Sequence, residues 1–243
     1  MGIPVVGRSL LHTAVEHGLV DENAVDALNS SCQINKADLG IDPDQITTDQ
    51  VNIATVLLDN SGSMESWESR VLSSYASALN TMKEAESRHN ILVGALGLCG
   101  NILYRYKLVK DAQPLTKRSY WGPDGPLDHT PLHRQIVKLC RLVKEKQGQL
   151  LEAGIPARTI TLLMTDAGDS DKSHELKAAA QKAIGQLLNG SKKNRVYGIA
   201  FGSEAKGALY ELGIPRETLF EAGNEKDLLD AFIQFSQATS AVM

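Results

Sequence analysis

Cysteine is scarce in this sequence, and its spacing shows no pattern. The chain of 243 residues has three cysteines, Cys32, Cys99 and Cys140, which lie far apart, and no CxxC pair or Cys/His ligand spacing accompanies them. This argues against a disulfide framework and against a zinc ribbon. Cys99 and Cys140 each fall within an apolar pattern, which is typical of small core residues. We therefore expect a protein of the reducing cytoplasm.

Long apolar runs and a strong excess of one charge are also missing. No segment approaches the about eighteen uninterrupted apolar residues of a membrane span. The net charge of −4 does not favour nucleic acid or an acidic membrane as a partner. Residues 1–18 lack the basic-then-apolar layout and the small-residue cleavage site of a signal peptide. We expect no membrane partner, no nucleic-acid partner and a cytoplasmic location.

From residue 51 onward the chain alternates apolar strands with amphipathic helices. The runs "VNIATVLL", "ARTITLLM" and "RVYGIAFG" predict buried strands, and helical spacing of apolar residues separates them. Helices of this length between strands predict right-handed crossovers and a parallel sheet covered on both faces. The runs "ILVGALGLC" and "ILYRYKLV", joined by a turn-favouring Gly-Asn pair, predict a hairpin. The predicted fold class is α/β, a doubly wound and mostly parallel sheet with one antiparallel edge strand.

Residues 1–50 have a different character. Two short helical patterns, "SLLHTAVEHGLV" and "DENAVDALNSS", precede a stretch of turn and breaker residues. We predict a helical arm at 1–50 and a main domain at 51–243, with the arm packed on the main domain. The arm is interpreted as a cap on a sheet edge, with a docking surface as the alternative.

Oxygen-bearing side chains follow the first two buried strands and open the helix between them. Asp59, Ser61 and Ser63 follow the first strand, Asp166 follows the second, and Thr130 precedes the helix. The carboxyl ends of parallel strands meet at one crest of the sheet, where α/β proteins bind ligands. A mixture of carboxylate and hydroxyl oxygens suits a hard cation, so we predict Mg²⁺, with Mn²⁺ or Ca²⁺ as alternatives.

With these motifs, residues of about 50–240 resemble the von Willebrand factor A (vWA) family. The pattern D-x-S-x-S in "DNSGSM", the threonine of "HTPLH" and the aspartate of "LLMTDAGD" match a complete metal-ion-dependent adhesion site in order and spacing. The resemblance implies a vWA fold in which the two serines and the threonine ligate Mg²⁺ directly and the aspartates often act through water. "LDH" before Thr130, where members often have glycine, departs from the family pattern.

A cation held mainly by neutral hydroxyls stays electrophilic and keeps water at its unfilled positions. An Asp or Glu of another protein can replace that water. The predicted function is therefore a non-enzymatic, Mg²⁺-dependent protein–protein interaction module, and the resemblance suggests an adaptor for an intracellular AAA+ ATPase or a multi-protein assembly.

The alternative is a Mg²⁺-dependent hydrolase or phosphotransferase that uses the same acidic site. The sequence gives this alternative little support. An aspartyl phosphotransferase needs a second aspartate where Ser61 stands, and "DNSGSM" lacks the G-x-S-x-G of a serine hydrolase. No lysine or arginine adjoins the five residues in sequence, and no phosphate-binding loop is present.

Two neighbouring features have more than one interpretation. His129 and His133 have a spacing that could hold zinc, but no third ligand is evident, so a rim or packing role is expected. Asp169 is expected in a solvated loop. The long segment 110–129 leads into Thr130 and contains Trp121, which either contacts a partner or folds back over the sheet edge.

Overall fold

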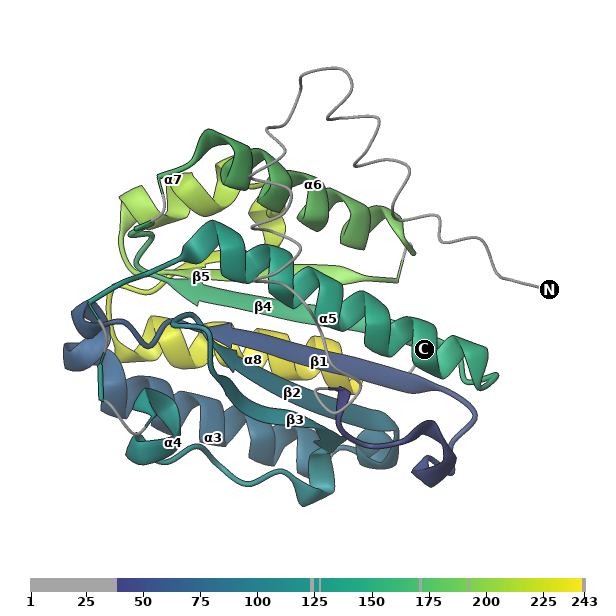
Figure 1. The fold of residues 1–243 in the computed structure, drawn as a ribbon. Coiled ribbons are helices and arrows are strands. Elements are labelled where there is room, and N and C mark those ends of the chain that lie inside the picture. Colours follow the sequence, from purple (N-terminus) through teal and green to yellow (C-terminus); the bar gives the residue numbers. More distant parts are fainter. Residues whose placement is uncertain (1–38, 123–124, 127, 171, 192, 242–243) are drawn as a thin grey trace, which may run out of the picture.

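The structure is a computed structural model that describes residues 39–241 apart from 123, 124, 127, 171 and 192 (Figure 1). Its centre is a six-stranded sheet in the order β3-β2-β1-β4-β5-β6. The strands are β1 Val51–Leu58, β2 Ile91–Gly97, β3 Ile102–Leu108, β4 Ala157–Thr165, β5 Arg195–Ala200 and β6 Leu219–Glu221. All neighbouring strands run parallel except the hairpin of β2 and β3. The predicted fold class and its single antiparallel edge strand are confirmed.

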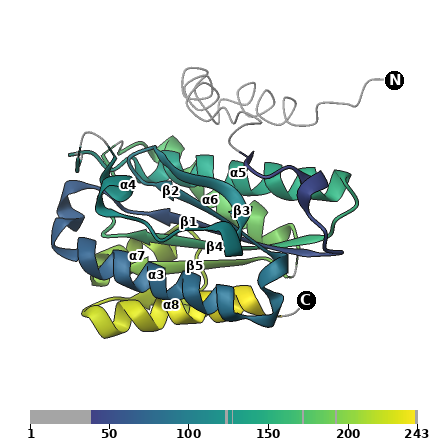
Figure 2. The ribbon, with the colours of Figure 1, turned by 90° about the horizontal axis from the view of Figure 1, so that it is seen from below.

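Helices cover both faces of this sheet (Figure 2). The helices are α3 Glu68–Glu84, α4 Lys117–Trp121, α5 Leu132–Glu152, α6 His174–Asn189, α7 Ser203–Glu211 and α8 Glu225–Ser240. Short 3₁₀ turns lie at Pro43–Gln45, Gly62–Trp67, Glu86–Asn90, Val109–Asp111 and Arg216–Thr218. Apolar residues of α5, α6 and α7 form one core with the sheet, and those of α3, α4 and α8 form the other. None of the helices in the described part of the chain has the length and apolar character needed to cross a membrane.

Strand β1 is mostly apolar because both of its faces are covered. All eight of its residues are buried. Ile53 and Leu57 belong to the core under α5, whereas Val56 and Leu58 belong to the core under α3 and α8. Side chains alternate between the faces of a strand, so apolar residues are needed on both faces. Truncating Leu57 to alanine is expected to cost about 2–5 kcal/mol of stability.

The part of the N-terminal arm that the structure describes, residues 39–50, packs on the main domain. Leu39 and Ile46 join the core under α5, and the Ile41 amide donates to the Tyr106 carbonyl oxygen of edge strand β3 at 2.8 Å. Gly40 has φ +66, and a Cβ there would lie 2.1 Å from the same carbonyl oxygen, so glycine is required. The helices predicted within residues 1–38 lie outside the described residues, and the division at residue 51 stays a prediction.

The arm also receives a buried lysine of α5. Lys146 is fully buried and donates from Nζ to the Ile41 carbonyl oxygen and to Gln149 Oε1. Burial lowers the pKa of Lys146 to about 8, because the charged form loses its hydration. Together with the hydrogen bond from Ile41 to β3, the contacts of Lys146 attach the arm to the β3 edge of the sheet.

Candidate metal centre

The first loop of the candidate site turns sharply after β1. Asp59 is fully buried, and its Oδ1 accepts hydrogen bonds from the Ser61 amide at 3.0 Å and from Ser61 Oγ at 2.6 Å. Ser61 Oγ lies 3.0 Å from Ser63 Oγ. The 3₁₀ turn that begins at Gly62 brings these oxygens together. Asp59, Ser61 and Ser63 therefore form one hydrogen-bonded group.

The second loop follows β4 and holds the other carboxylate oxygen of Asp59. Thr165 Oγ1 donates to Asp59 Oδ2 at 2.7 Å, and the Asp166 amide approaches the same oxygen at 3.4 Å. Ala167 has φ 72 and donates from its amide to Thr165 Oγ1 at 2.9 Å. The pairing of β1 with β4 aligns the two strand ends, because Leu58 lies opposite Met164. The acids that follow the two strands thus meet at one crest of the sheet.

The third loop leads into α5 and carries Thr130. The Thr130 carbonyl oxygen accepts a hydrogen bond from the Ser170 amide at 2.9 Å. Thr130 Oγ1 and Asp166 Oδ1 each lie 3.9 Å from the position that a Cβ of residue 168 would occupy. Gly168 therefore lies beside both side chains. The structure places all five predicted residues on adjoining loops, with Thr130 connected to the others through the loop of Asp166.

The electrostatics of Asp59 favour a cation. Burial raises the pKa of Asp59, while its hydrogen bonds from Ser61 and Thr165 oppose this rise and the charge of Asp166 adds to it. Its hydrogen-bond donors are all neutral: two hydroxyls and two backbone amides. A buried carboxylate without a cationic partner is costly. A divalent cation would supply the missing charge, so the residues present fit one.

The donor set also indicates which cation fits. Among the described residues, no group of three or more His, Cys, Asp and Glu side chains could hold a metal. The candidate set instead combines two carboxylates with the hydroxyls of Ser61, Ser63 and Thr130, which retain lone pairs for coordination. Burial, with the charge of Asp59, raises the pKa of the nearby Cys99 thiol to about 11, so that thiol stays protonated. Oxygen donors of this kind suit Mg²⁺ better than a thiolate-preferring metal.

Two supporting residues were not predicted. The Tyr120 hydroxyl donates to the Asp59 carbonyl oxygen. Asn60 donates from Nδ2 to the Tyr120 carbonyl oxygen at 2.9 Å and to Asn101 Oδ1 at 3.1 Å, and its Oδ1 accepts from the Cys99 amide at 3.0 Å. Asn60 and Tyr120 therefore fasten the β1 loop to the β2–β3 turn and to α4.

The segment 110–129 contains a helix and folds back over the domain. Thr116 and Ser119 form a reciprocal cap that begins α4, although Ser119 stands where the usual sequence signature has Glu or Gln. Trp121 is only 5% exposed, and its Nε1 donates to Glu68 Oε2 at 2.6 Å. This bond, together with Lys117 at 2.9 Å, lowers the pKa of Glu68. Trp121 is a covering residue, and its interpretation as a partner contact is wrong.

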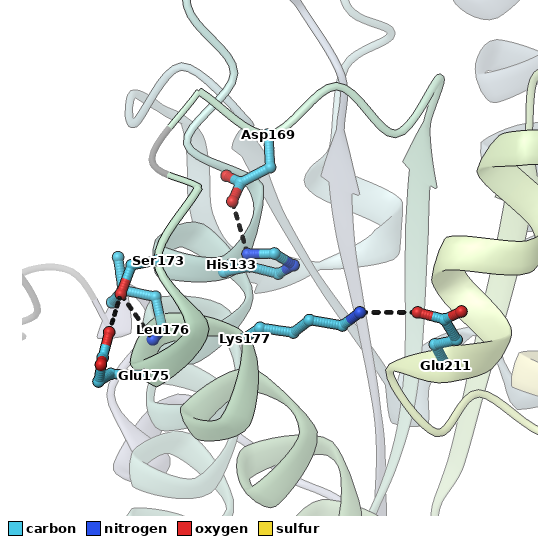
Figure 3. Close-up of polar contacts among 7 residues, drawn as sticks. All are labelled: His133, Asp169, Ser173, Glu175, Leu176, Lys177 and Glu211. Atoms are coloured by element: carbon cyan, nitrogen blue, oxygen red, sulfur yellow. Dashed lines mark hydrogen bonds and ion pairs between the residues drawn. The ribbon is translucent and has the colours of Figure 1, made fainter. Parts of the chain in front are cut away.

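The structure also corrects the expectation for Asp169. Its side chain is 11% exposed and lies 2.6 Å from His133, so it is not in a solvated loop (Figure 3). His129 is exposed. The rim or packing role expected for these histidines is consistent with both observations.

Comparison with protein-family models and with curated protein sequences finds no match. Solved structures with a similar fold include the open conformation of the pilus adhesin SpaC from Lactobacillus rhamnosus GG. The TM-score to SpaC is 0.59 at 11% identity, over 80% of this chain and 30% of that protein. Proximal thread matrix protein 1 from the mussel byssus, in crystal form 2, matches with a TM-score of 0.52 at 13% identity, over 78% of this chain and 48% of that protein.

A weaker resemblance is to manganese-loaded TRAP protein of Plasmodium vivax, with a TM-score of 0.46 at 16% identity over 76% of this chain and 74% of that one. This chain spans about a third of the length of SpaC and about half of the byssus protein. Similarities at this level of identity show the fold. The architecture is an α/β fold of the vWA/Rossmann-like kind, with the candidate residues at the carboxyl ends of its strands.

Proposed function

We propose that this chain is a protein-interaction module whose three loops hold a divalent cation, Mg²⁺ in the first instance, and through it a carboxylate of a partner protein. The observation that carries the proposal is the buried carboxylate of Asp59, which has only neutral hydrogen-bond donors and lies beside the hydroxyls of Ser61 and Ser63. Asp59, Ser61, Ser63, Thr130 and Asp166 would hold the cation. When bound, it supplies an electrophilic coordination position.

Hydrogen bonds within the chain hold the candidate ligands in place before a cation binds. The Ser61 amide and Thr165 Oγ1 fix the two oxygens of Asp59 in place. The Tyr120 hydroxyl holds the backbone of the same loop at Asp59, and Asn60 ties that loop to α4. Preorganised oxygens lose little freedom on binding, so little of the binding free energy is spent on ordering them. Thr130 and Asp166 lie nearer the solvent edge, where a partner side chain would arrive.

The fold comparisons add modest support. SpaC is described as a pilus adhesin, and a binding role on this fold agrees with the proposal. The cytoplasmic location and the adaptor role for an AAA+ ATPase depend on the vWA resemblance and on the sequence composition, and they stay part of the proposal.

The proposal is non-enzymatic, and the rival hydrolase or phosphotransferase makes a different prediction. A phosphoester-cleaving enzyme would turn over p-nitrophenyl phosphate in Mg²⁺, and Asp59→Asn would abolish the turnover. A binding module would show no turnover above that of buffer with Mg²⁺.

Capture of a carboxylate can be measured by the fluorescence anisotropy of a labelled glutamate-rich peptide. We expect saturable binding in Mg²⁺ that is lost in chelator, lost for the glutamine version of the peptide, and lost in Asp59→Asn. The matched control is Asp230→Asn on the exposed side of α8, which should bind as wild type does. Binding that is indifferent to chelator and to Asp59→Asn would contradict the proposal.

A further inference from the structure

A buried contact between an imidazole and a carboxylate joins the start of α5, just after the Thr130 loop, to the loop that carries Asp166. His133 Nδ1 lies 2.6 Å from Asp169 Oδ2, and the two side chains are 12% and 11% exposed. Figure 3 shows the imidazole and the carboxylate pointing toward one another, His133 from the start of α5 and Asp169 from the loop after β4. Neither residue belongs to the five predicted ligands.

The positions of the pair relate it directly to the site. His133 lies three residues after Thr130, in the first turn of α5, and Asp169 lies three residues after Asp166. The Ser170 amide, next to Asp169, donates to the Thr130 carbonyl oxygen at 2.9 Å. One side-chain contact and one backbone hydrogen bond therefore fasten the Thr130 loop to the Asp166 loop.

Each member of the pair depends on the other. Within the described part of the chain, His133 Nδ1 and both carboxylate oxygens of Asp169 are buried without a hydrogen bond. His133 Nδ1 and Asp169 Oδ2, which lie 2.6 Å apart, are therefore each other's close polar contact in this buried place. Removing one member of a buried pair leaves the other uncompensated.

We propose that His133 and Asp169 are positioning residues that clamp Thr130 beside Asp166 in the arrangement that receives the cation. This inference builds on the proposed function, since it concerns the same site. Neither side chain needs to touch the metal. Partners behind the ligands typically contribute about 10–100-fold to metal affinity, because they fix the orientation of the ligating groups.

A second ion pair provides a matched control. Lys177 on α6 and Glu211 on α7 also lie 2.6 Å apart, but they are 37% and 62% exposed and join one helix to another (Figure 3). An exposed pair contributes little to stability. Lys177→Gln breaks this pair and removes a contact of the same length that involves neither the Thr130 loop nor the Asp166 loop.

The test compares His133→Gln, Asp169→Asn, their double variant and Lys177→Gln by two measurements. The first is hydrogen exchange at the Ser170 amide in chelator-treated protein, followed by NMR. The second is calorimetric titration of Mg²⁺. We expect faster exchange at Ser170 and about tenfold weaker Mg²⁺ binding in each single variant. The double variant should resemble the single ones, because the two residues act through each other. The control should match wild type.

The outcomes separate the clamp from the proposed function. Faster exchange in the variants with no Mg²⁺ binding by wild type would support the clamp and refute the metal site. Unchanged exchange together with unchanged Mg²⁺ affinity would overturn the clamp and leave the metal site standing. Effects that simply add in the double variant would show two independent packing roles, which also overturns the clamp.

Discussion

The two acids that follow β1 and β4 occupy equivalent places in the sheet but have different surroundings. Asp59 is fully buried and accepts four contacts from neutral groups. Asp166 is half-buried, and its side chain receives the Gly168 amide at 3.4 Å. Both are acids that follow an apolar strand, yet the Asp59 carboxylate is shielded from water and the Asp166 carboxylate is partly exposed to it. Under the proposed function, Asp59 would anchor the cation and Asp166 would contact it from the solvent side.

The largest expected effect is that of Asp59→Asn. The amide cannot balance a divalent charge, so Mg²⁺ binding should fall by more than about 100-fold, since the variant loses a charged group at the centre of the site. Wild type should gain about 2.7 kcal/mol of stability at a Mg²⁺ concentration of 100 times Kd. The variant should gain less than about 0.4 kcal/mol at the same concentration. Thermal unfolding with and without Mg²⁺ measures both, and Asp230→Asn serves as the control.

Asp166→Asn should have a smaller effect on the cation. Because Asp166 borders solvent, we expect about tenfold weaker Mg²⁺ binding and a change of less than about 0.5 kcal/mol in the stability of the metal-free protein. Calorimetry and urea unfolding measure these quantities. Equal losses of Mg²⁺ affinity in Asp59→Asn and Asp166→Asn would contradict the different roles given to the two acids.

The raised pKa of Asp59 predicts a pH dependence with a definite sign. Above the ordinary value of 3.8 the unfolded chain releases its proton while the folded, metal-free protein retains it. The folded state then binds more protons, so the free energy of unfolding contributed by Asp59 falls as pH rises through the interval between the two pKa values. The difference between wild type and Asp59→Asn in urea unfolding, measured from pH 4 upward without metal, isolates this contribution. A difference that does not change with pH would mean that burial does not raise the pKa of Asp59.

The smallest effect expected is that of Tyr120→Phe. It removes the hydroxyl that donates to the Asp59 carbonyl oxygen and leaves the ring in its core. One hydrogen bond contributes about 1 kcal/mol, so stability should fall by about that amount and Mg²⁺ affinity should fall less than in Asp166→Asn. Thermal unfolding and calorimetry measure the two effects. A loss of Mg²⁺ binding as large as in Asp59→Asn would place Tyr120 within the site itself.

Local patterns predicted most of the fold because burial on two faces leaves a direct record in sequence. The apolar run of β1 and the amphipathic spacing of α5 correspond to residues that the structure buries. The parallel pairing of most strands followed from the rules for crossovers, and the hairpin from its turn residues. The loops that carry the candidate residues could be placed together because the carboxyl ends of parallel strands meet at one edge of the sheet.

The supports of the site could not be predicted in this way. Tyr120 and Asp59 are 61 positions apart, and their contact depends on how segment 110–122 folds back across the sheet edge. The five-residue helix α4 is too short to be stable alone and depends on the packing of Tyr120 and Trp121. The contact of His133 with Asp169 joins two loops whose separation is set by the tertiary structure rather than by spacing.

The central claim is that the three loops hold one divalent cation through Asp59. Its most direct test is a calorimetric titration of Mg²⁺ into chelator-stripped protein, repeated with Asp59→Asn. We predict saturable binding at a single site in wild type and no binding in the variant. Absence of binding in wild type, or equal binding by both proteins, would contradict the claim.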